Sequence, residues 1–300
     1  MKIPKNVSAS VRQRLLNISR NKKRPFQEVL QYFAMDRFLY RLSQSPFVDN
    51  FILKGALLLR VWDADEFRPT MDIDLAGQTS NDEKNIQNIF REIIINEVLN
   101  DGLVFFEESV TTQPIKADSD YHGVRVLFIG QLDSARINMQ IDVGFNDIIF
   151  PSSEEHILPT ILNFPAPTLK CYSKETVIGE KFETIVKLGY QNSRMKDFYD
   201  IWLLSRLYNF NGNQLSEAVK KIFNHRMTSY KGEIFAFEAD FQDIKRIQWN
   251  AFIKKLKQDH AQITLDQVLN HLKLFLKPIV DSINNNSPLP EYWNAPGPWV

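Results

Sequence analysis

Two aspartates, Asp72 and Asp74, alternate with apolar residues in the run Met71-Asp-Ile-Asp-Leu75. If this run is a β-strand, side chains two residues apart point to the same face, so the two carboxylates lie together. Like charges this close repel each other and are stabilised by a cation between them. Asp-x-Asp pairs also occur in ordinary surface loops, but ionised aspartates are rare in an apolar strand without a partner. The run is a candidate divalent-metal site, with a surface loop as the alternative.

A turn rich in small residues precedes this run. An apolar strand over residues 51–53 is predicted to stop at Gly55, and a short apolar helix follows to Trp62. The first N–H groups of a helix and its dipole favour an anion such as phosphate, which would place Gly55 and Ala56 at a phosphate. A simple turn is the alternative. A phosphate cradle next to paired carboxylates is the layout of an enzyme that acts on nucleoside triphosphates.

A third carboxylate is predicted on another strand. Strand-like runs cover residues 103–110, 124–129 and 136–145, and in the last of these Asn138, Gln140 and Asp142 share one face. Asp142 could therefore lie beside the Asp pair and complete a two-metal arrangement for phosphoryl transfer. The alternative is a polar surface strand. Asp147 is a weaker candidate, because Asn-Asp pairs in loops are usually turn formers.

A second group of charged residues lies on two predicted helices further along the chain. Its members are close in sequence to Phe198, Tyr199 and Trp202, which favours a partly buried ionic network, while a surface ladder of salt bridges is the alternative. The charged residues considered are Lys181, Arg194, Lys196, Asp197 and Asp200.

These motifs together resemble one known family. The strings Phe51-x-Leu-Lys-Gly-Ala-Leu-Leu-Leu and Arg68-Pro-Thr-x-Asp-Ile-Asp-Leu are similar to the first motif of the DNA polymerase β-like nucleotidyltransferases, and specifically to the AbiEii/AbiGii-type toxins. Glu180-Lys-Phe and Asn192-Ser-Arg-x-Lys-Asp-x-x-Asp resemble later motifs of the same toxins. Ala56 departs from the pattern, because the superfamily commonly has a second Gly or Ser there.

The resemblance implies Mg²⁺ or Mn²⁺ as cofactor and a nucleoside triphosphate as substrate. It implies transfer of a nucleoside monophosphate to an acceptor, the 3′ end of tRNA or another RNA, by a toxin of an abortive-infection (phage-defence) system held in check by an antitoxin protein. The metal ligands would be Asp72, Asp74 and Asp142, which with Lys181 and Asp197 form the catalytic set. The nucleotide would be bound by Gly55, Ala56, Arg68, Lys181, Arg194, Lys196 and Asp200.

The expected fold is an α/β (α+β) nucleotidyltransferase core with a mixed sheet, followed by a helical domain. We expect N-terminal helices over 1–45, the core over 46–170, the helical domain over 171–283 and a Pro/aromatic tail over 284–300. Residues 151–170 are Pro-rich and are predicted to form an extended connector. The tail should pack along the body of the protein or on a partner.

Composition limits the other possibilities. The chain has 300 residues, a formal net charge of zero and one cysteine, and it contains no apolar run that approaches a membrane span. We therefore expect a cytoplasmic protein without disulfides or membrane contact, in which RNA binding depends on local basic patches. Eight Lys or Arg and no acid occur in residues 1–24, which could contact RNA phosphates, with a solvated cationic helix face as the favoured alternative. Two further basic clusters, which could equally be exposed helix faces, comprise Lys220, Lys221, Arg226 and Lys231, and Lys254, Lys255 and Lys257.

Two other functions remain open from the sequence. One is a small-molecule or protein nucleotidyltransferase, which shares the chemistry but not the acceptor. The other is a catalytically inactive RNA- or partner-binding module with the same fold. The intact Asp-Ile-Asp string disfavours the inactive module, because carboxylates that repel one another are costly to retain without a role.

Overall fold

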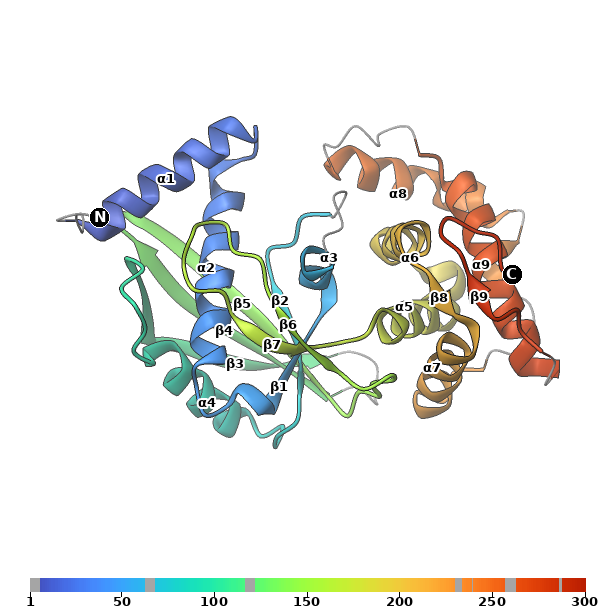
Figure 1. Cartoon of the computed structure of the whole chain (residues 1–300), viewed down its shortest axis with the longest axis horizontal. Helices are drawn as coiled ribbons and strands as arrows, with labels where there is room; N and C mark the ends of the chain where they lie inside the picture. Colours follow the sequence, from blue (N-terminus) through green and yellow to red (C-terminus); the bar gives the residue numbers. More distant parts are fainter. Residues whose placement is uncertain are drawn as a thin grey trace. The chain divides into compact units, whose positions relative to one another are not determined.

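The computed structural model describes residues 6–62, 68–116, 122–229, 234–238, 240–256, 263–285 and 288–300 (Figure 1). The chain forms two compact units. The first, the sheet unit, comprises Met1–Asp147 and Glu154–Cys171. The second, the helical unit, comprises Ile148–Ser153 and Tyr172–Val300. In the part of the chain that is described, none of the helices has the length and apolar character needed to cross a bilayer.

The sheet unit is built on a mixed sheet of seven strands in the order β3-β4-β5-β2-β1-β7-β6. The strand β2 runs parallel to β5 and β1 runs parallel to β7, and the other neighbours are antiparallel. This mixed α/β architecture confirms the expected fold class. The strands are β1 (Phe51–Lys54), β2 (Ile73–Gly77), β3 (Leu103–Lys116), β4 (His122–Leu132), β5 (Ala135–Phe145), β6 (Glu154–Ile157) and β7 (Thr168–Cys171).

The segment predicted as an extended connector is only partly one. Residues 168–171 form β7, which lies beside β1, and residues 154–157 form β6, the edge strand next to β7. Both strands are short, and prolines flank them in the sequence, so neither has a run of alternating residues long enough to identify it. The prediction of an extended connector over 151–170 therefore missed that residues 154–157 and 168–171 pair as strands of the sheet.

Helices cover one face of the sheet. They are α1 (Val7–Asn21), α2 (Phe26–Ser43) and α4 (Glu83–Ile95), while the four-residue α3 (Leu58–Val61) follows the turn after β1. The ring of Phe38 on α2 packs against Phe90 on α4 and against Phe105 and Phe128 on the sheet. Because α2 also contacts Met139 on β5 through Gln31, the apolar residues of β5 face the helices, and the residues between them face the other way.

Two helices of this unit begin at a residue whose side chain caps them. The side chain of Asn6 caps α1 by accepting a hydrogen bond from the Ala9 amide. The side chain of Asp82 caps α4 by accepting a hydrogen bond from the Asn85 amide. In both cases the residue that caps has its amide or carboxylate oxygen positioned at the third following N–H, which is the usual capping geometry.

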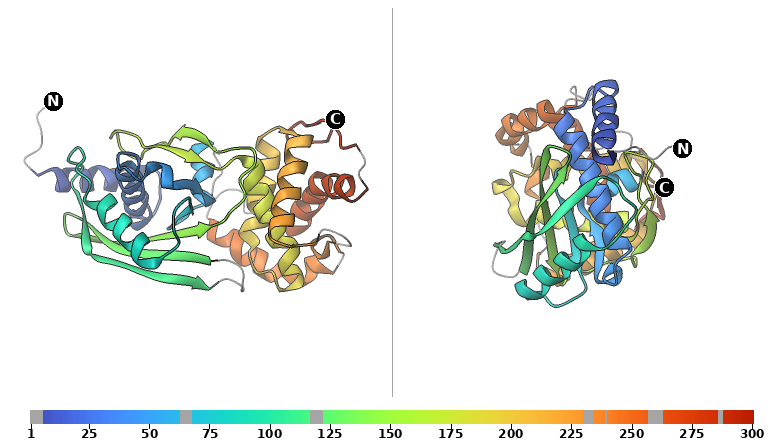
Figure 2. Two further views of the ribbon diagram at one scale, coloured as in Figure 1. Left: turned by 90° about the horizontal axis from the view of Figure 1, so that it is seen from below. Right: turned by 90° about the vertical axis from the view of Figure 1, so that its left-hand side faces the viewer.

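The helical unit comprises five longer helices and a small two-stranded sheet (Figure 2, yellow to red). The tail packs on this unit: β9 pairs with β8, and Trp293 is 1% exposed among Phe210, Phe275 and Trp299. The predicted packing of the tail along the body is thus confirmed. The elements are α5 (Lys174–Leu188), α6 (Met195–Leu207), β8 (Phe210–Asn211), α7 (Gly212–His225), α8 (Phe241–Leu256), α9 (Leu265–Asn285) and β9 (Tyr292–Trp293), with 3-10 turns η3 (Gly189–Gln191) and η4 (Phe235–Phe237).

Candidate active site

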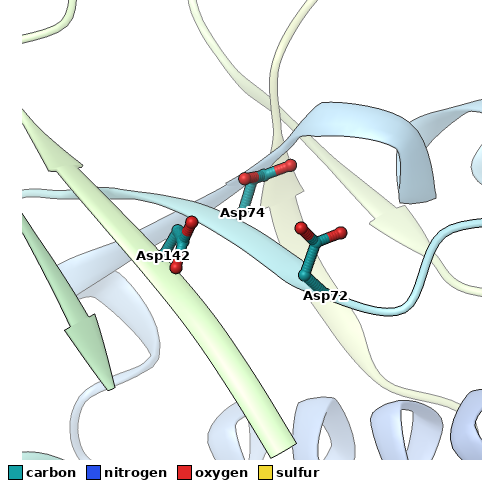
Figure 3. Close-up of side chains that lie close together, drawn as sticks. All are labelled: Asp72, Asp74 and Asp142. Carbon is teal, nitrogen blue, oxygen red and sulfur yellow. The ribbon is translucent and has the colours of Figure 1, made fainter. Parts of the chain in front are cut away.

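Three carboxylates converge on the face of the sheet that points away from the helices. Asp74 on β2 lies directly opposite Asp142 on the parallel strand β5, and Asp72 comes two residues earlier. One oxygen from each of the three side chains lies within 4.8 Å of the others (Figure 3). All three side chains are half-buried. The strand of Asp142 therefore lies beside that of the Asp pair, as the alternation of residues predicts.

The register of the sheet extends this group into a row of four charges. Arg125 on β4 lies opposite Asp142, Asp142 opposite Asp74, and Asp74 opposite Lys54 on β1. Directly opposite residues on neighbouring strands point to the same face. The row therefore reads cation, carboxylate, carboxylate, cation, with Asp72 beside its two central members.

Arg125 was not among the residues singled out from the sequence. Its guanidinium donates two hydrogen bonds to Asp142, from Nε to Oδ1 and from Nη2 to Oδ2, both at 2.8 Å. The hydrogen bond to Asp142 raises the pKa of Arg125, and burial opposes this, while the charges of Asp142, Asp72 and Asp74 add to the increase. The sequence did contain an indication that Arg125 has a partner, because it is the one Lys, Arg, Asp or Glu in the apolar run of β4.

Hydrogen bonds from α2 anchor the loop that carries Asp72. The Thr70 hydroxyl donates to Asp72, and the Thr70 amide donates to the Tyr32 hydroxyl at 3.0 Å. The Gln31 amide group donates to the carbonyl oxygens of Met71 and of Asn138, at 3.1 and 3.2 Å, and so ties this loop to β5. These contacts hold the first carboxylate of the group next to the other two.

The turn after β1 approaches Asp74 closely at Gly55. This residue has φ +76°, and a Cβ atom there would lie 2.0 Å from Oδ2 of Asp74. Only glycine fits, for both conformational and steric reasons. Gly55–Leu57 form a single 3-10 turn before the four residues of α3, and the Ala56 side chain is buried. The predicted short helix is present, while phosphate binding by Gly55 and Ala56 stays a prediction.

Lys54, Asp147 and Arg68 complete the surroundings within the sheet unit. Lys54 forms an ion pair with Asp147, whose side chain is 2% exposed. Asp147, the weaker candidate for the third carboxylate, is thus paired with a lysine and does not belong to the triad. Arg68, predicted to bind the nucleotide, lies on the segment leading to β2 and is 9% exposed.

The second charged cluster lies in the helical unit, on α5 and α6. Lys181 Nζ lies 3.0 Å from Oδ1 of Asp197 and 2.8 Å from Oδ2 of Asp200, and Arg194 Nε lies 2.6 Å from Oδ2 of Asp197. Both aspartates are 1% exposed. Because Arg194 is 48% exposed while the aspartates are buried, the cluster is a partly buried ionic network and not a surface ladder. Lys196 lies on the first turn of α6 and is half-buried.

The environment of Asp197 favours its ionised form. Burial alone would raise the pKa of this carboxyl, but the charges of Lys181 and Arg194 and their hydrogen bonds outweigh burial and lower the pKa to about 2. Next to it, the fully buried Asn192 accepts a hydrogen bond from the Arg194 amide at 2.7 Å, while its Nδ2 donor has no partner among the described residues. An unpaired buried donor of this kind is costly and fits a ligand with acceptor oxygens.

The basic clusters suggested for RNA binding differ from one another in the structure. Arg226 is engaged by Glu180 and Glu183, both at 2.9 Å, and Lys221 lies 3.3 Å from Glu217. The patch predicted there is therefore largely neutralised by neighbouring acids. Lys254 and Lys255 are exposed on α8. Lys231 and Lys257 lie outside the described residues.

The fold and the triad define a class of protein. Carboxylate oxygens are the ligands that Mg²⁺ and Mn²⁺ prefer, and three of them within 4.8 Å fit such an ion. Carboxylates converging from two neighbouring strands of a mixed sheet, next to a glycine turn, are the arrangement of a nucleotidyltransferase.

Comparison with known proteins gives the family. The family model described as "Nucleotidyl transferase AbiEii toxin, Type IV TA system" matches residues 37–271. The chain belongs to this family of nucleotidyltransferases, which are toxins of toxin–antitoxin systems. No curated protein matches the sequence.

Two solved structures from Helicobacter pylori are similar in fold. One is JHP933, with 13% identity, a TM-score of 0.46 and coverage of 83% of this chain and 90% of that one. The other is provisionally assigned as a nucleotidyltransferase, with 13% identity, a TM-score of 0.49 and coverage of 84% and 94%.

Proposed function

We propose that this protein transfers a nucleoside monophosphate from a nucleoside triphosphate to the 3′ end of tRNA, in a reaction that depends on Mg²⁺ or Mn²⁺. The observation that carries the proposal is the convergence of Asp72, Asp74 and Asp142. In this reaction the acceptor hydroxyl attacks the α-phosphorus, its proton is lost, and pyrophosphate leaves. Asp72 and Asp74 would hold the metal, with Asp142 as a further ligand or as the acceptor of the proton. The metal would supply charge stabilisation for the attacking oxygen and the leaving pyrophosphate.

In this proposal, four cationic side chains offset the charge of the nucleotide. The negative charge of the triphosphate and of the departing pyrophosphate must be offset, and Arg68, Lys181, Arg194 and Lys196 would do so. Asp197 and Asp200 hold Lys181 in place through the contacts described above. The amides of Gly55 and Ala56 are proposed to contact the phosphates next to Asp74.

The proposed RNA acceptor is supported by the charge of the N-terminal helix. Arg14 and Arg20 on α1, and Lys22 and Lys23 just after it, are exposed in a segment without acids. The chain continues directly into α2, whose Gln31 contacts the Met71 carbonyl next to Asp72. An RNA backbone bound along this segment would therefore lie on the same unit as the triad. The toxin family also implies a cognate antitoxin, and we propose a cytoplasmic role in defence against phage.

The acceptor and the nucleotide can be identified in a single experiment. Each of four α-³²P-labelled nucleoside triphosphates is incubated with total tRNA and Mg²⁺, and the wild type is compared with Asp74→Ala. We expect label in tRNA from one preferred nucleotide and none with the variant. Label in a protein or small molecule instead would support a different acceptor. A folded Asp74→Ala that transfers label as well as the wild type would contradict the metal assignment, and no transfer together with metal-independent nucleotide binding would support the inactive module.

A further inference from the structure

Arg125 is bonded to the triad in a way that the proposed chemistry does not explain. Both oxygens of Asp142 accept a hydrogen bond from its guanidinium, at 2.8 Å each, and Gln140 Nε2 lies 3.3 and 3.4 Å from the same two oxygens. A carboxylate has about four acceptor positions, so a bidentate arginine occupies half of them. A metal ion that binds Asp142 must therefore share this side chain with Arg125.

The net charge of the triad also depends on Arg125. Three carboxylates carry −3, and the guanidinium of Arg125 reduces this to −2, while the charge of Lys54 at the other end of the row is offset by its ion pair with Asp147. A charge of −2 equals that of one divalent ion with opposite sign. Without Arg125, the three like charges would repel one another more strongly and would attract cations more strongly. Arg125 therefore acts on the site before any metal or nucleotide arrives.

We propose that Arg125 is a positioning residue that fixes Asp142 in the acidic row and weakens the binding of a metal ion at the triad. The inference rests on the proposed function of the triad as a metal site. Its mechanism has two separable parts. The positive charge lowers the affinity for a cation, and the planar fork of the guanidinium sets the orientation of the carboxylate.

If Arg125 only supported the fold, its variants would lose stability. The Arg125 side chain is 34% exposed and that of Asp142 20% exposed, and ion pairs at such exposure contribute little to folding. We therefore expect Arg125 variants to fold. The four-residue register from Arg125 to Lys54 depends on backbone hydrogen bonds of the sheet, which the substitution does not remove.

The test uses four variants of the full chain. Arg125→Gln removes the charge and the fork, and Arg125→Lys keeps the charge but not the fork. Arg136→Gln is the matched control, because Arg136 is exposed on β5 on the same face as Asp142 and six residues away, about 20 Å along the strand. Asp74→Asn reports whether the metal binds at the triad. Binding of Mn²⁺ alone, without nucleotide, is measured by electron paramagnetic resonance of the free ion, and thermal unfolding checks the fold.

The two Arg125 variants should separate the two parts of the mechanism. For Arg125→Gln we expect Mn²⁺ to bind about tenfold more tightly than to the wild type, since a unit charge near a divalent ion has an effect of this order even in water. Arg125→Lys should bind Mn²⁺ within about threefold of the wild type. Both variants should show a lower kcat for nucleotidyl transfer, because Asp142 is no longer held by two parallel hydrogen bonds. Arg136→Gln should match the wild type in both measurements.

Two results would contradict the inference, and they are distinguishable. If Asp74→Asn weakens Mn²⁺ binding but Arg125→Gln binds it no more tightly than Arg136→Gln does, the triad is a metal site and the role assigned to Arg125 is wrong. If Asp74→Asn binds Mn²⁺ as the wild type does, the metal site itself is wrong, and the inference about Arg125 fails with it. A kcat of Arg125→Lys equal to that of the wild type would contradict the role of the fork.

Discussion

The two charged groups of this protein differ in net charge and in burial. The triad in the sheet unit has three half-buried carboxylates and one arginine bonded to them, which leaves a net charge of −2. In the helical unit, Asp197 and Asp200 are 1% exposed and are matched by Lys181 and Arg194, which leaves no net charge. The first group carries a negative charge that a bound cation would offset, whereas the second is balanced within the chain. A binding site for a metal and a rigid support for cationic side chains differ in this way.

The largest expected effect is on catalysis at the unbalanced group. Asp74→Asn keeps the shape of the side chain and removes one metal ligand, so nucleotidyl transfer should fall by about a thousandfold or more, a size typical for loss of a central electrostatic group. The free energy of unfolding should be unchanged or slightly higher, because one of three repelling charges is gone. Single-turnover transfer and urea denaturation check the two parts. A large loss of stability would contradict this prediction, because it would show that the negative charges of the triad are already compensated within the chain.

Removing a cation from the balanced group should instead lower the free energy of unfolding. Lys181→Met removes the ion pairs of Lys181 with the buried Asp197 and Asp200, while Arg194 still contacts Asp197. Breaking a buried ion pair in this manner costs about 3–5 kcal/mol. We expect this loss in the free energy of unfolding by urea denaturation. The control is Lys187→Met on the same helix, at an exposed position. Equal stability of the two variants would mean that the network contributes nothing.

The close approach at Gly55 provides a further test of the triad. Gly55→Ala introduces a Cβ that would lie 2.0 Å from Asp74 Oδ2 at a φ of +76°, so the turn or the carboxylate must move. We expect a loss of about 1–3 kcal/mol in unfolding free energy, typical of strain at such a position, and weaker Mg²⁺ binding. Ala56→Gly, one residue later, should retain metal binding. Metal affinity of Gly55→Ala equal to that of the wild type would show that Asp74 does not need this geometry.

The smallest expected effect is in the acid range. The folded-state pKa of Asp197 is lowered to about 2, so its contribution to stability is fully present above its ordinary pKa near 4 and is lost as the pH falls from about 4 to about 2. Stability of the wild type should decrease with falling pH over this interval more steeply than that of Asp197→Asn. Chemical denaturation at a series of pH values measures the slopes. Identical slopes would contradict the assignment of an ionised, paired Asp197.

Alternation within single strands was enough to predict the faces of Asp74 and Asp142, because side-chain direction in a strand has a fixed period. Alternation allowed the strand of Asp142 to lie beside that of the Asp pair, but the pairing of β2 with β5 and its register come from the structure. Arg125 was missed because its partner is set by the register of β4 against β5, which separates the two residues by 17 positions in the sequence. Burial of the Lys181 network likewise depends on how α5 and α6 pack, which local charge spacing does not determine.

The central claim is that Asp72, Asp74 and Asp142 bind a divalent cation. The most direct measurement is anomalous diffraction from crystals of the full chain soaked in Mn²⁺, with Asp74→Asn crystals treated in the same way. We expect an anomalous peak within coordination distance of the three carboxylates in the wild type and a weaker or absent peak in the variant. Manganese bound elsewhere, with no peak at the triad, would contradict the account.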